Sequence, residues 1–347
     1  MEGISLEELA LAARNHGMPL EALRYPVTPV GLHYLLIHYD VPVVEPDTWR
    51  LTVRGERELV LGLEELRARP AAEVTVTMEC AGNGRAKLDP RPVSQPWLLE
   101  AVGTARWRGT PLRPLLEDAG IGGAVEVLCT GLDRGIEAEE EQAFQRSVPL
   151  EEALRDEVLL AYEMNGAPLP PQHGFPLRLV VPGWYGMTNV KWLERIELVD
   201  TPFAGYQNSW SYRLRQAEEE EGVPLDRMQP RSLMVPPGIP EFMTRDRTVA
   251  AGSVLLEGRA WSGHARVDEV EVSADGGETW DAAELEPAGE PWAWRGWSYR
   301  WNAEPGEHVL CCRARDEAGN EQPHDPPWNL GGYANNAVQA VRVTVTP

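Results

Sequence analysis

The stretch TMECAGNGR, residues 77–85, places a cysteine where an alternating apolar strand gives way to two glycines and an arginine. Glycines at 82 and 84 let the backbone turn sharply after Cys80, so its sulfur can project from the strand end into a cavity. Backbone amides exposed in such a turn, with Arg85 nearby, favour the thiolate over the thiol. A single cysteine before a turn can also be structural, so other residues must decide its role.

A second segment, HGFPLRLVVPGWYGMTNVKWLERIEL at 173–198, holds three side chains that can donate to an anion: His173, Arg178 and Lys191. Lys191 is one of two lysines in a chain with thirty arginines. Each of the three, taken alone, could be a surface charge or a satisfied core histidine. Together with the cysteine turn they indicate an anion-binding site.

Length and charge limit the kind of protein. A chain of 347 residues exceeds one ordinary hydrophobic core, which predicts two domains. A net charge of -22 argues against a general nucleic-acid or anionic-membrane surface, although a local basic pocket would stand out in it. No apolar run approaches the roughly 18 residues of a membrane span. The first residues also lack the basic segment followed by an apolar segment that is typical of a signal peptide. We therefore expect no nucleic-acid or membrane partner and a cytoplasmic location.

The first two hundred residues mix two kinds of hydrophobic pattern. Strands are predicted at 73–80, 124–131 and 176–183, where apolar runs end at small or turn residues. Helical spacing with proline near the first turn predicts helices at 110–120 and 147–164. This part of the chain is expected to be an α+β domain.

From Gly252 onward the pattern changes to short strands separated by turn residues. ADGGETW at 274–280 is a hairpin signal, because two adjacent glycines can adopt positive φ. Five or more such strands predict an all-β sandwich of immunoglobulin type. An acidic run at 217–224 and a proline-rich stretch at 234–241 mark the joint between the two parts.

With these residues in view, the sequence resembles the sulfite oxidase family of molybdenum enzymes. The matching motifs are CAGNGR, EVLLAYEMNGAPLPPQHGFPLRLVVPG with NVKWLERIEL, VEVSADGGETW, PWAWRGW and PPWNLGGYANNA, in order over residues 28–347. The resemblance implies an N-terminal extension at 1–27 and an α+β molybdopterin-binding catalytic domain at 28–230. It also implies an immunoglobulin-like β-sandwich dimerisation domain at 231–347.

The resemblance implies a cofactor and assigns residues to it. Molybdenum would be held by the two dithiolene sulfurs of molybdopterin and by Cys80, whose soft thiolate suits such a metal. The positions matching the pterin-binding residues, or able to complete their shell, are His38, Asn83, Asp133, His173, Arg178 and Lys191. On the substrate side, Arg85 and Trp97 match family positions. Tyr212 is the best candidate for the tyrosine that donates a hydrogen bond or relays a proton.

The chain departs from the family pattern in its anion pocket. Sulfite oxidases carry arginine and asparagine at the positions of Leu36 and Ile37, and arginine at the position of Gly331. A dianion removed from water requires compensating charge. Either Arg213 or Arg215 replaces that charge, or the pocket takes a less charged substrate.

The resemblance implies two-electron oxygen-atom transfer, with sulfite to sulfate as the first choice and a molybdenum-dependent reductase of a sulfoxide or other small oxo substrate as the alternative. No CxxCH haem motif occurs, so a separate electron acceptor is expected, and the family's last domain implies a homodimer. A thiol hydrolase would instead use Cys80 as a nucleophile activated by His173 or His38. A non-enzymatic adhesion or scaffold protein is the third class.

Overall fold

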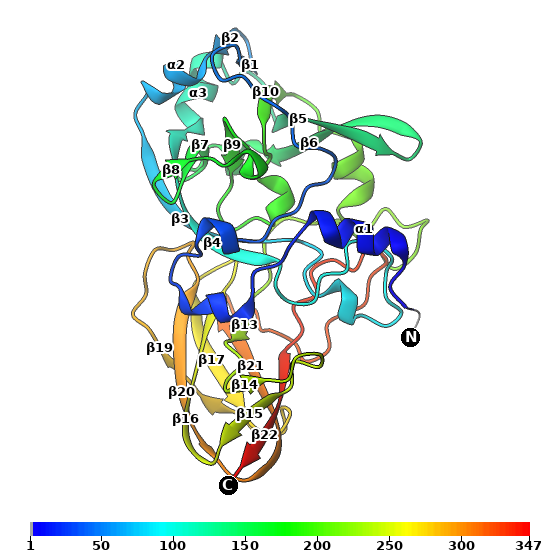
Figure 1. Cartoon of the computed structure of the whole chain (residues 1–347). Coiled ribbons are helices and arrows are strands. Elements are labelled where there is room, and N and C mark those ends of the chain that lie inside the picture. The colour runs from blue at the N-terminus through cyan, green and yellow to red at the C-terminus, as the bar shows by residue number, and fades with distance from the viewer. Residues whose placement is uncertain (1–2) are drawn as a thin grey trace.

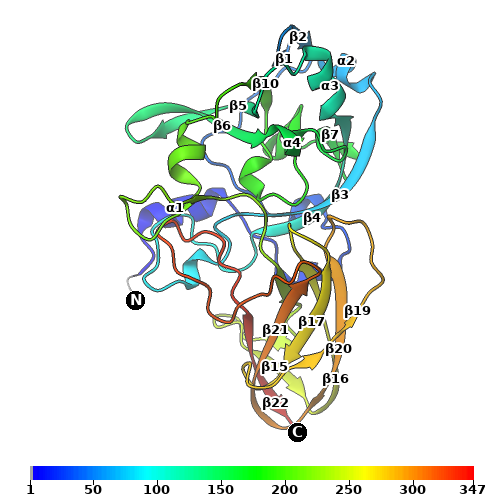
Figure 2. The same ribbon diagram turned by 180° about the vertical axis from the view of Figure 1, so that it is seen from behind.

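The computed structural model describes residues 3–347 and shows two bodies stacked end to end. The first, blue to green in Figure 1, carries mixed sheets and short helices, and the second, yellow to red, is built of strands. The view from behind in Figure 2 shows the same division, with β3 and β4 lying where the two bodies meet.

The first body contains two sheets. The first has the order β2-β1-β10-β5-β6, in which β1 and β10 are parallel and the other neighbours antiparallel. Its strands are β1 (Leu51–Arg54), β2 (Glu58–Leu61), β5 (Glu126–Glu137), β6 (Glu140–Pro149) and β10 (Leu193–Val199). The second, entirely antiparallel, has the order β3-β4-β7-β8, with β9 also pairing β7. Its strands are β3 (Ala72–Glu79), β4 (Val102–Pro111), β7 (Leu159–Met164), β8 (Ala167–Pro168) and β9 (Arg178–Val180).

The helices are short, and α2, α3 and α4 pack on strands of these sheets. The α-helices are α1 (Leu6–Arg14), α2 (Leu63–Arg67), α3 (Leu112–Ala119) and α4 (Leu150–Ala153). The 3-10 turns are η1 (Leu20–Arg24), η2 (Val30–Leu32), η3 (Arg85–Lys87), η4 (Pro171–His173) and η5 (Gly186–Thr188), and η6 (Gln207–Ser211) is a π-helix. A two-stranded ribbon, β11 (Arg213–Leu214) and β12 (Val223–Pro224), follows η6.

The helix predicted at 110–120 is confirmed, whereas the one predicted at 147–164 is wrong over most of its length. In α3 the apolar residues at 112, 115, 116 and 119 are buried on one face, and Gly120 ends the helix with φ 84°. Residues 147–164 instead form the end of β6, the single turn α4 and the strand β7. A short apolar run fits a buried strand as well as a helix, and pairing of β7 with β4 and β9 decides it.

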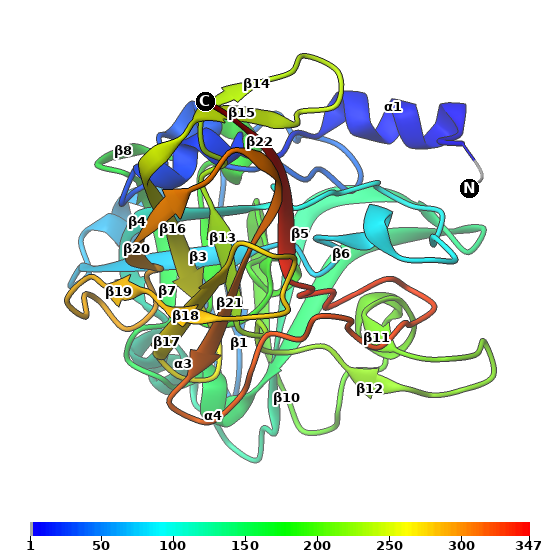
Figure 3. The same ribbon diagram turned by 90° about the horizontal axis from the view of Figure 1, so that it is seen from below.

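The second body is a β-sandwich, as the sequence predicts. One sheet has the order β13-β16-β20-β19 and the other β14-β15-β22-β21-β17-β18. The strands are β13 (Arg231–Met234), β14 (Ile239–Pro240), β15 (Arg247–Ala250), β16 (Gly252–Trp261), β17 (Val267–Ser273), β18 (Asp281–Ala282), β19 (Glu284–Leu285), β20 (Arg295–Ala303), β21 (Gly306–Asp316) and β22 (Gln339–Thr346). Figure 3 shows the sandwich from below. Trp297, Trp301 and Leu310 belong to the apolar core between its two sheets. The hairpin predicted at 274–280 joins β17 to β18, with φ 80° and 99° at its two glycines.

A buried ionic cluster joins the two bodies directly beside the cysteine. The carboxylate of Glu79, the last residue of β3, lies 2.9 Å from an Nη atom of Arg231 on β13. It also accepts hydrogen bonds from the indole of Trp261 at 2.9 Å and from the amide of Asn83 at 3.0 Å. Glu79 and Arg231 are 3% and 1% exposed, so neither charge can be solvated if its partner is removed.

Breaking this pair should destabilise the protein strongly. We expect Arg231→Met to lower the free energy of unfolding by about 3–5 kcal/mol, because it leaves the Glu79 charge buried and uncompensated. Urea unfolding followed by tryptophan fluorescence measures this. The matched control is Arg54→Met, which breaks the half-exposed Arg54–Glu58 pair and should cost less than about 1 kcal/mol. Equal losses in both variants would contradict the assignment.

Candidate functional site

Cys80 lies directly after β3 and is held by the backbone on both sides. Its amide donates to the carbonyl of Ala101 at 2.9 Å, and its own carbonyl accepts from the amide of Asn83 at 2.9 Å, which closes the turn. The thiol is unpaired, and the residue is 7% exposed. A Cβ at position 82 would lie 2.7 Å from the guanidinium carbon of Arg85, so glycine is required there for the arginine to fold back over the turn.

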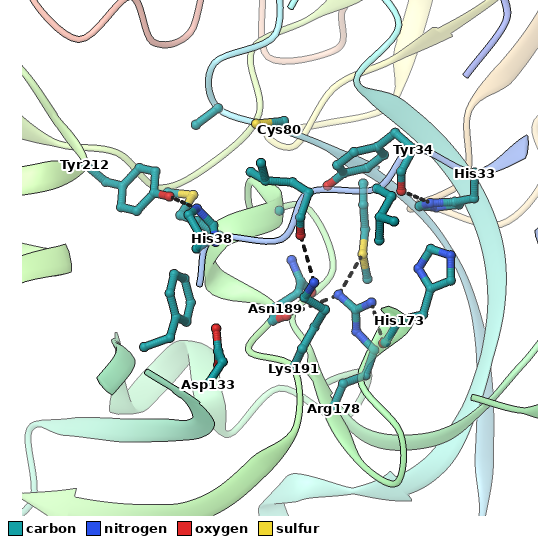
Figure 4. Close-up of a pocket in the computed structure, with 17 residues that line it drawn as sticks. His33, Tyr34, His38, Cys80, Asp133, His173, Arg178, Asn189, Lys191 and Tyr212 are labelled. Carbon is teal, nitrogen blue, oxygen red and sulfur yellow. Dashed lines mark hydrogen bonds between the residues drawn. The ribbon is translucent and has the colours of Figure 1, made fainter. Parts of the chain in front are cut away.

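The Cys80 side chain borders a cavity that encloses about 640 Å³, part of it open to solvent. Figure 4 shows the cavity with the residues that line it. Seven of the residues predicted for the site line it: His38, Cys80, Asp133, His173, Arg178, Lys191 and Tyr212. They come from segments far apart in the sequence, including β5, η4, β9 and the residue after η6. The fold therefore brings most of the predicted site together.

One end of the cavity concentrates positive charge. Arg178 donates to the carbonyls of His173 and Asn189, each at 3.1 Å. Lys191 donates to the carbonyls of Leu36 at 2.7 Å and Gln172 at 3.3 Å. Neither cation forms an ion pair with a carboxylate within residues 3–347, and both face space that an anion can fill.

In the protein without a cofactor, burial shifts the pKa values of Lys191, Asp133 and His173. Burial and the nearby Arg178 charge lower the pKa of Lys191 to about 7, against the opposing effect of Asp133. Burial raises the pKa of Asp133 to about 6, against the opposing charge of Lys191. Burial also lowers the pKa of His173 to about 2, so this imidazole is neutral and can accept or donate a hydrogen bond.

Tyr212 and Cys80 both line the other part of the cavity. The Tyr212 hydroxyl lies 2.5 Å from Nε2 of His38. Burial lowers the pKa of His38 to about 3, so the ring is neutral and its tautomer sets which of the two groups donates. The phenyl ring of Phe144 stacks on His38 with ring centres 4.7 Å apart. Hence this hydroxyl has a fixed direction beside Cys80.

Burial of Cys80 favours its neutral thiol, whereas several neighbouring groups favour the thiolate. Burial raises the pKa of the Cys80 thiol, whereas the Arg85 charge, the backbone at Gly82 and the side chain of Trp97 lower it. Trp97 packs against Cys80 in a small apolar cluster. A metal at the sulfur would decide this balance, because metal binding deprotonates a thiol outright.

Three of the predicted residues do not line the cavity. Arg85 turns away, with its Nε donating to the carbonyl of Gly331 at 2.8 Å and its guanidinium 5.0 Å from the ring centre of Tyr333. Trp97 lies behind the sulfur. The side chain of Asn83 donates to Glu79 and Leu99 and accepts from Ala101. Its amide is therefore occupied in holding the turn, and its position does not support a contact with a cofactor.

Neither arginine proposed to replace the missing charge reaches the cavity. Arg213 pairs with the exposed Glu221 at 3.2 Å, and Arg215 lies over the ring of Trp210 at 4.4 Å. The structure does not support that part of the sequence-based explanation, because Arg213 also donates to the carbonyls of Glu221 and Gly222, and Arg215, just after β11, donates to the carbonyl of Trp210.

The structure adds lining residues that the sequence analysis did not identify. These are the side chains of His33, Tyr34, Leu35, Met78, Ala81, Phe144, Met187 and Asn189. Gly186, after which backbone amides could complete the pterin shell, and Leu36, which stands where the family has an arginine, also line the cavity. A Cβ at position 186 would lie 2.2 Å from the Tyr34 hydroxyl, so glycine is needed for the close approach. No local signal marks these residues, because their common feature is a shared cavity and not a shared sequence pattern.

The hydrolase alternative finds no support in this geometry. No hydrogen bond joins Cys80 to His38 or His173 in the part of the chain that the structure describes. Nε2 of His38 is hydrogen-bonded to the Tyr212 hydroxyl instead. A nucleophile activated by a general base requires such a bond or a close approach to it.

Comparisons with known proteins show the family of the chain. A family model described as an oxidoreductase molybdopterin binding domain matches residues 38–207, and one described as a Mo-co oxidoreductase dimerisation domain matches residues 225–346. The sulfite oxidase of Gallus gallus is 39% identical over 90% of this chain and 72% of its own length. The chain belongs to the sulfite oxidase family.

Other members of this family are also similar. The mitochondrial sulfite oxidase of Rattus norvegicus is 38% identical over 92% of this chain, which spans 62% of that protein, and the nitrate reductase [NAD(P)H] of Hordeum vulgare is 34% identical over 92% of this chain and 39% of its own length. The crystal structure of the sulfane dehydrogenase SoxCD from Paracoccus pantotrophus aligns with a TM-score of 0.82 at 28% identity, covering 94% of this chain and 84% of that one. The family and fold class predicted from the sequence are confirmed. No helix within residues 3–347 is long and apolar enough to cross a bilayer.

The residues present fit the molybdopterin that the family implies. The site offers one free thiol, and two buried polar atoms of lining residues have no partner, Oδ1 of Asp133 and Nε of Arg178. An acidic phosphate satisfies cations that have no carboxylate partner, and a pterin ring supplies donors and acceptors for Asp133 and His173.

Lys191→Met should separate stability from cofactor binding. A lysine whose pKa is lowered to about 7 by folding makes the unfolded state bind more protons above pH 7, so the cofactor-free protein gains stability as pH rises from about 7 toward 10.5. The variant should lose this rise and be more stable near pH 7 by about 1–4 kcal/mol. Urea unfolding at several pH values measures it.

The same variant should retain less molybdopterin. Pterin analysis of the purified protein, with Lys87→Met as the control because Lys87 does not line the cavity, completes the test. An unchanged pterin content together with an unchanged pH dependence would contradict the role given to Lys191.

Proposed function

We propose that the protein is a molybdenum-dependent oxidoreductase that oxidises sulfite to sulfate. Sulfite gains one oxygen atom from water, and two protons and two electrons leave, the electrons passing to a separate acceptor. The observation that supports this most is the cluster of buried, unpaired cations around a free thiol in a chain of net charge -22. Such a cluster suits an anionic cofactor together with an anionic substrate.

The cofactor would lie between Cys80 and the cationic end of the cavity. Molybdopterin, when bound, supplies a molybdenum centre that exchanges an oxygen atom and two electrons with a small substrate. Cys80 would be the protein ligand to that metal. Arg178, Lys191 and His173 would hold the pterin phosphate and ring, and Asp133 would accept a hydrogen bond from the heterocycle.

On the substrate side, the chain's own residues position a proton and exclude water. With His38 in the tautomer that carries its proton on Nε2, the Tyr212 hydroxyl accepts from His38 and can donate its own proton to an oxygen of the substrate. Trp97 packs against the sulfur and keeps this side of the site apolar. Arg85, within electrostatic reach of Cys80, adds positive potential.

A reductase of a sulfoxide or another small oxo substrate is the second candidate. Leu36 lines the cavity with an apolar side chain. A Cβ at position 331 would lie 2.3 Å from the ring of Tyr333, so any side chain larger than that of glycine would displace the tyrosine. Both features favour a substrate with less charge than sulfite.

The remaining partners follow from the same assignment. We propose a homodimer formed through the segment at 225–346, which resembles a dimerisation domain; sedimentation should then give twice the 38.6 kDa chain mass. The domain boundaries at 28 and 230 and the cytoplasmic location remain predictions.

Replacing Cys80 tests the function directly. We expect Cys80→Ser to fold but to oxidise sulfite more than about 100-fold more slowly, since even outer-shell partners of metal ligands are worth about 10–100-fold. Sulfite-dependent reduction of an artificial one-electron acceptor measures the rate, and circular dichroism checks the fold.

Cys311→Ala is the matched control, because Cys311 is also buried but lies on β21 of the sandwich. Full turnover by Cys80→Ser would rule out the assignment. A wild-type protein that holds molybdenum, does not oxidise sulfite and reduces a sulfoxide would favour the second candidate.

A further inference from the structure

The buried arginines of this protein fall into two groups. Six arginines in the described part of the chain are buried: Arg85, Arg146, Arg178, Arg231, Arg247 and Arg259. The last three each pair with a carboxylate, from Glu79, Glu21 and Glu286 respectively. The first three form no ion pair within residues 3–347. Arg178 lines the Cys80 cavity, Arg85 acts electrostatically on Cys80, and Arg146 lies against the ring of Tyr212, which lines the cavity. Arg85 and Arg178 already have places in the proposed site, which leaves Arg146.

Arg146 lies on β6 and faces the cavity side of its sheet. It is 3% exposed, and Phe144, two residues earlier on the same face of the strand, lines the cavity. One Nη group donates to the carbonyl of Gln207, and the Nε atom is buried with no partner. A fully buried guanidinium with an unused donor and no carboxylate is costly unless it serves a nearby negative charge.

The guanidinium reaches the site through Tyr212. Its central carbon lies 5.5 Å from the centre of the Tyr212 ring, within the range of a cation–π interaction. The Tyr212 ring in turn lies 5.4 Å from that of Tyr333, whose other neighbour is Arg85 at 5.0 Å. Two tyrosine rings are thus placed between two unpaired arginines, Arg146 and Arg85.

This arrangement changes what the Tyr212 hydroxyl can do. A cation at the ring draws electron density from the phenol, so its O–H becomes a stronger donor toward an anion. The hydroxyl borders the cavity beside Cys80 and is held in direction by His38. The positive potential of Arg146 is therefore delivered at the substrate side of the cavity without a direct contact.

We propose that Arg146 is a positioning residue that sets the preference of the substrate pocket for a small oxyanion. It acts through Tyr212, by fixing the ring and by adding positive potential where Leu36 and Gly331 provide none. This inference deepens the proposed sulfite oxidation and rests on it for the identity of the substrate.

The test compares Arg146→Gln and Arg146→Lys with the wild-type holoenzyme. For sulfite oxidation we expect the KM of Arg146→Gln to rise about tenfold with a much smaller change in kcat, because the lost charge acts on anion binding. Arg146→Lys keeps the charge and should bring KM back to within about threefold. Arg247→Gln, another buried arginine that is paired with Glu21 far from the cavity, is the matched control and should leave KM unchanged.

A second readout does not depend on turnover. Sulfate, the dianionic product, is titrated into each holoenzyme while tryptophan fluorescence is followed, and its Kd should weaken about tenfold in Arg146→Gln but not in Arg247→Gln. If Arg146→Gln does not fold, Arg146→Met takes its place, since an apolar side chain of similar volume is often tolerated where a buried charge is removed.

Unchanged KM and sulfate affinity in the neutral variant would overturn the proposal. So would a fall in kcat and molybdenum content at constant sulfate affinity, because that is what a merely structural arginine produces. If the wild-type protein does not oxidise sulfite, the proposed function fails, whereas the comparison of sulfate affinities still decides the role of Arg146.

Discussion

The structure depends on a constraint of charge: a buried cation must be matched by an anion. Elsewhere in the described chain a carboxylate of the same protein supplies the anion; Glu79, for example, pairs with Arg231. In and beside the Cys80 cavity it is not met, because Arg85, Arg146, Arg178 and Lys191 form no ion pair with a carboxylate within residues 3–347. The folded protein therefore holds a surplus of positive charge in a chain that is strongly acidic overall. An anionic cofactor and an anionic substrate are the natural complements of that surplus.

The placement of the cysteine shows how the fold supports this site. β3 ends at the junction of the two bodies, and its last side chain, Glu79, is fixed by Arg231 and Trp261 from the sandwich. The next residue, Cys80, is consequently held at the junction while its sulfur faces the cavity. A ligand on a rigid, doubly anchored strand end is more accurately placed than one on a free loop. The sandwich thus contributes to the site although no residue of β13–β22 lines the cavity.

The departures from the family pattern have a physical explanation in the packing. The ring of Tyr333 fills the space where a side chain at position 331 would begin, and Arg85 bonds the carbonyl at 331. The proposed source of positive potential is instead Arg146, which lies on β6 behind the ring of Tyr212. Charge compensation is a property of the whole pocket, so a cation can lie on another segment of the chain while the potential at the substrate remains.

The amino-acid sequence by itself determined the features that are local or periodic. The glycine turn after Cys80, the apolar face of α3 and the hairpin at 274–280 follow from neighbouring residues, and the ordered family motifs indicated most of the cavity residues. Only the tertiary structure decided that β7 is a strand, because pairing with β4 and β9 outweighs local preference. It also decided that Asn83 serves the turn and that Arg146 lacks a carboxylate. Whether a buried charge has a partner depends on residues far apart in the chain, and no sequence pattern records that.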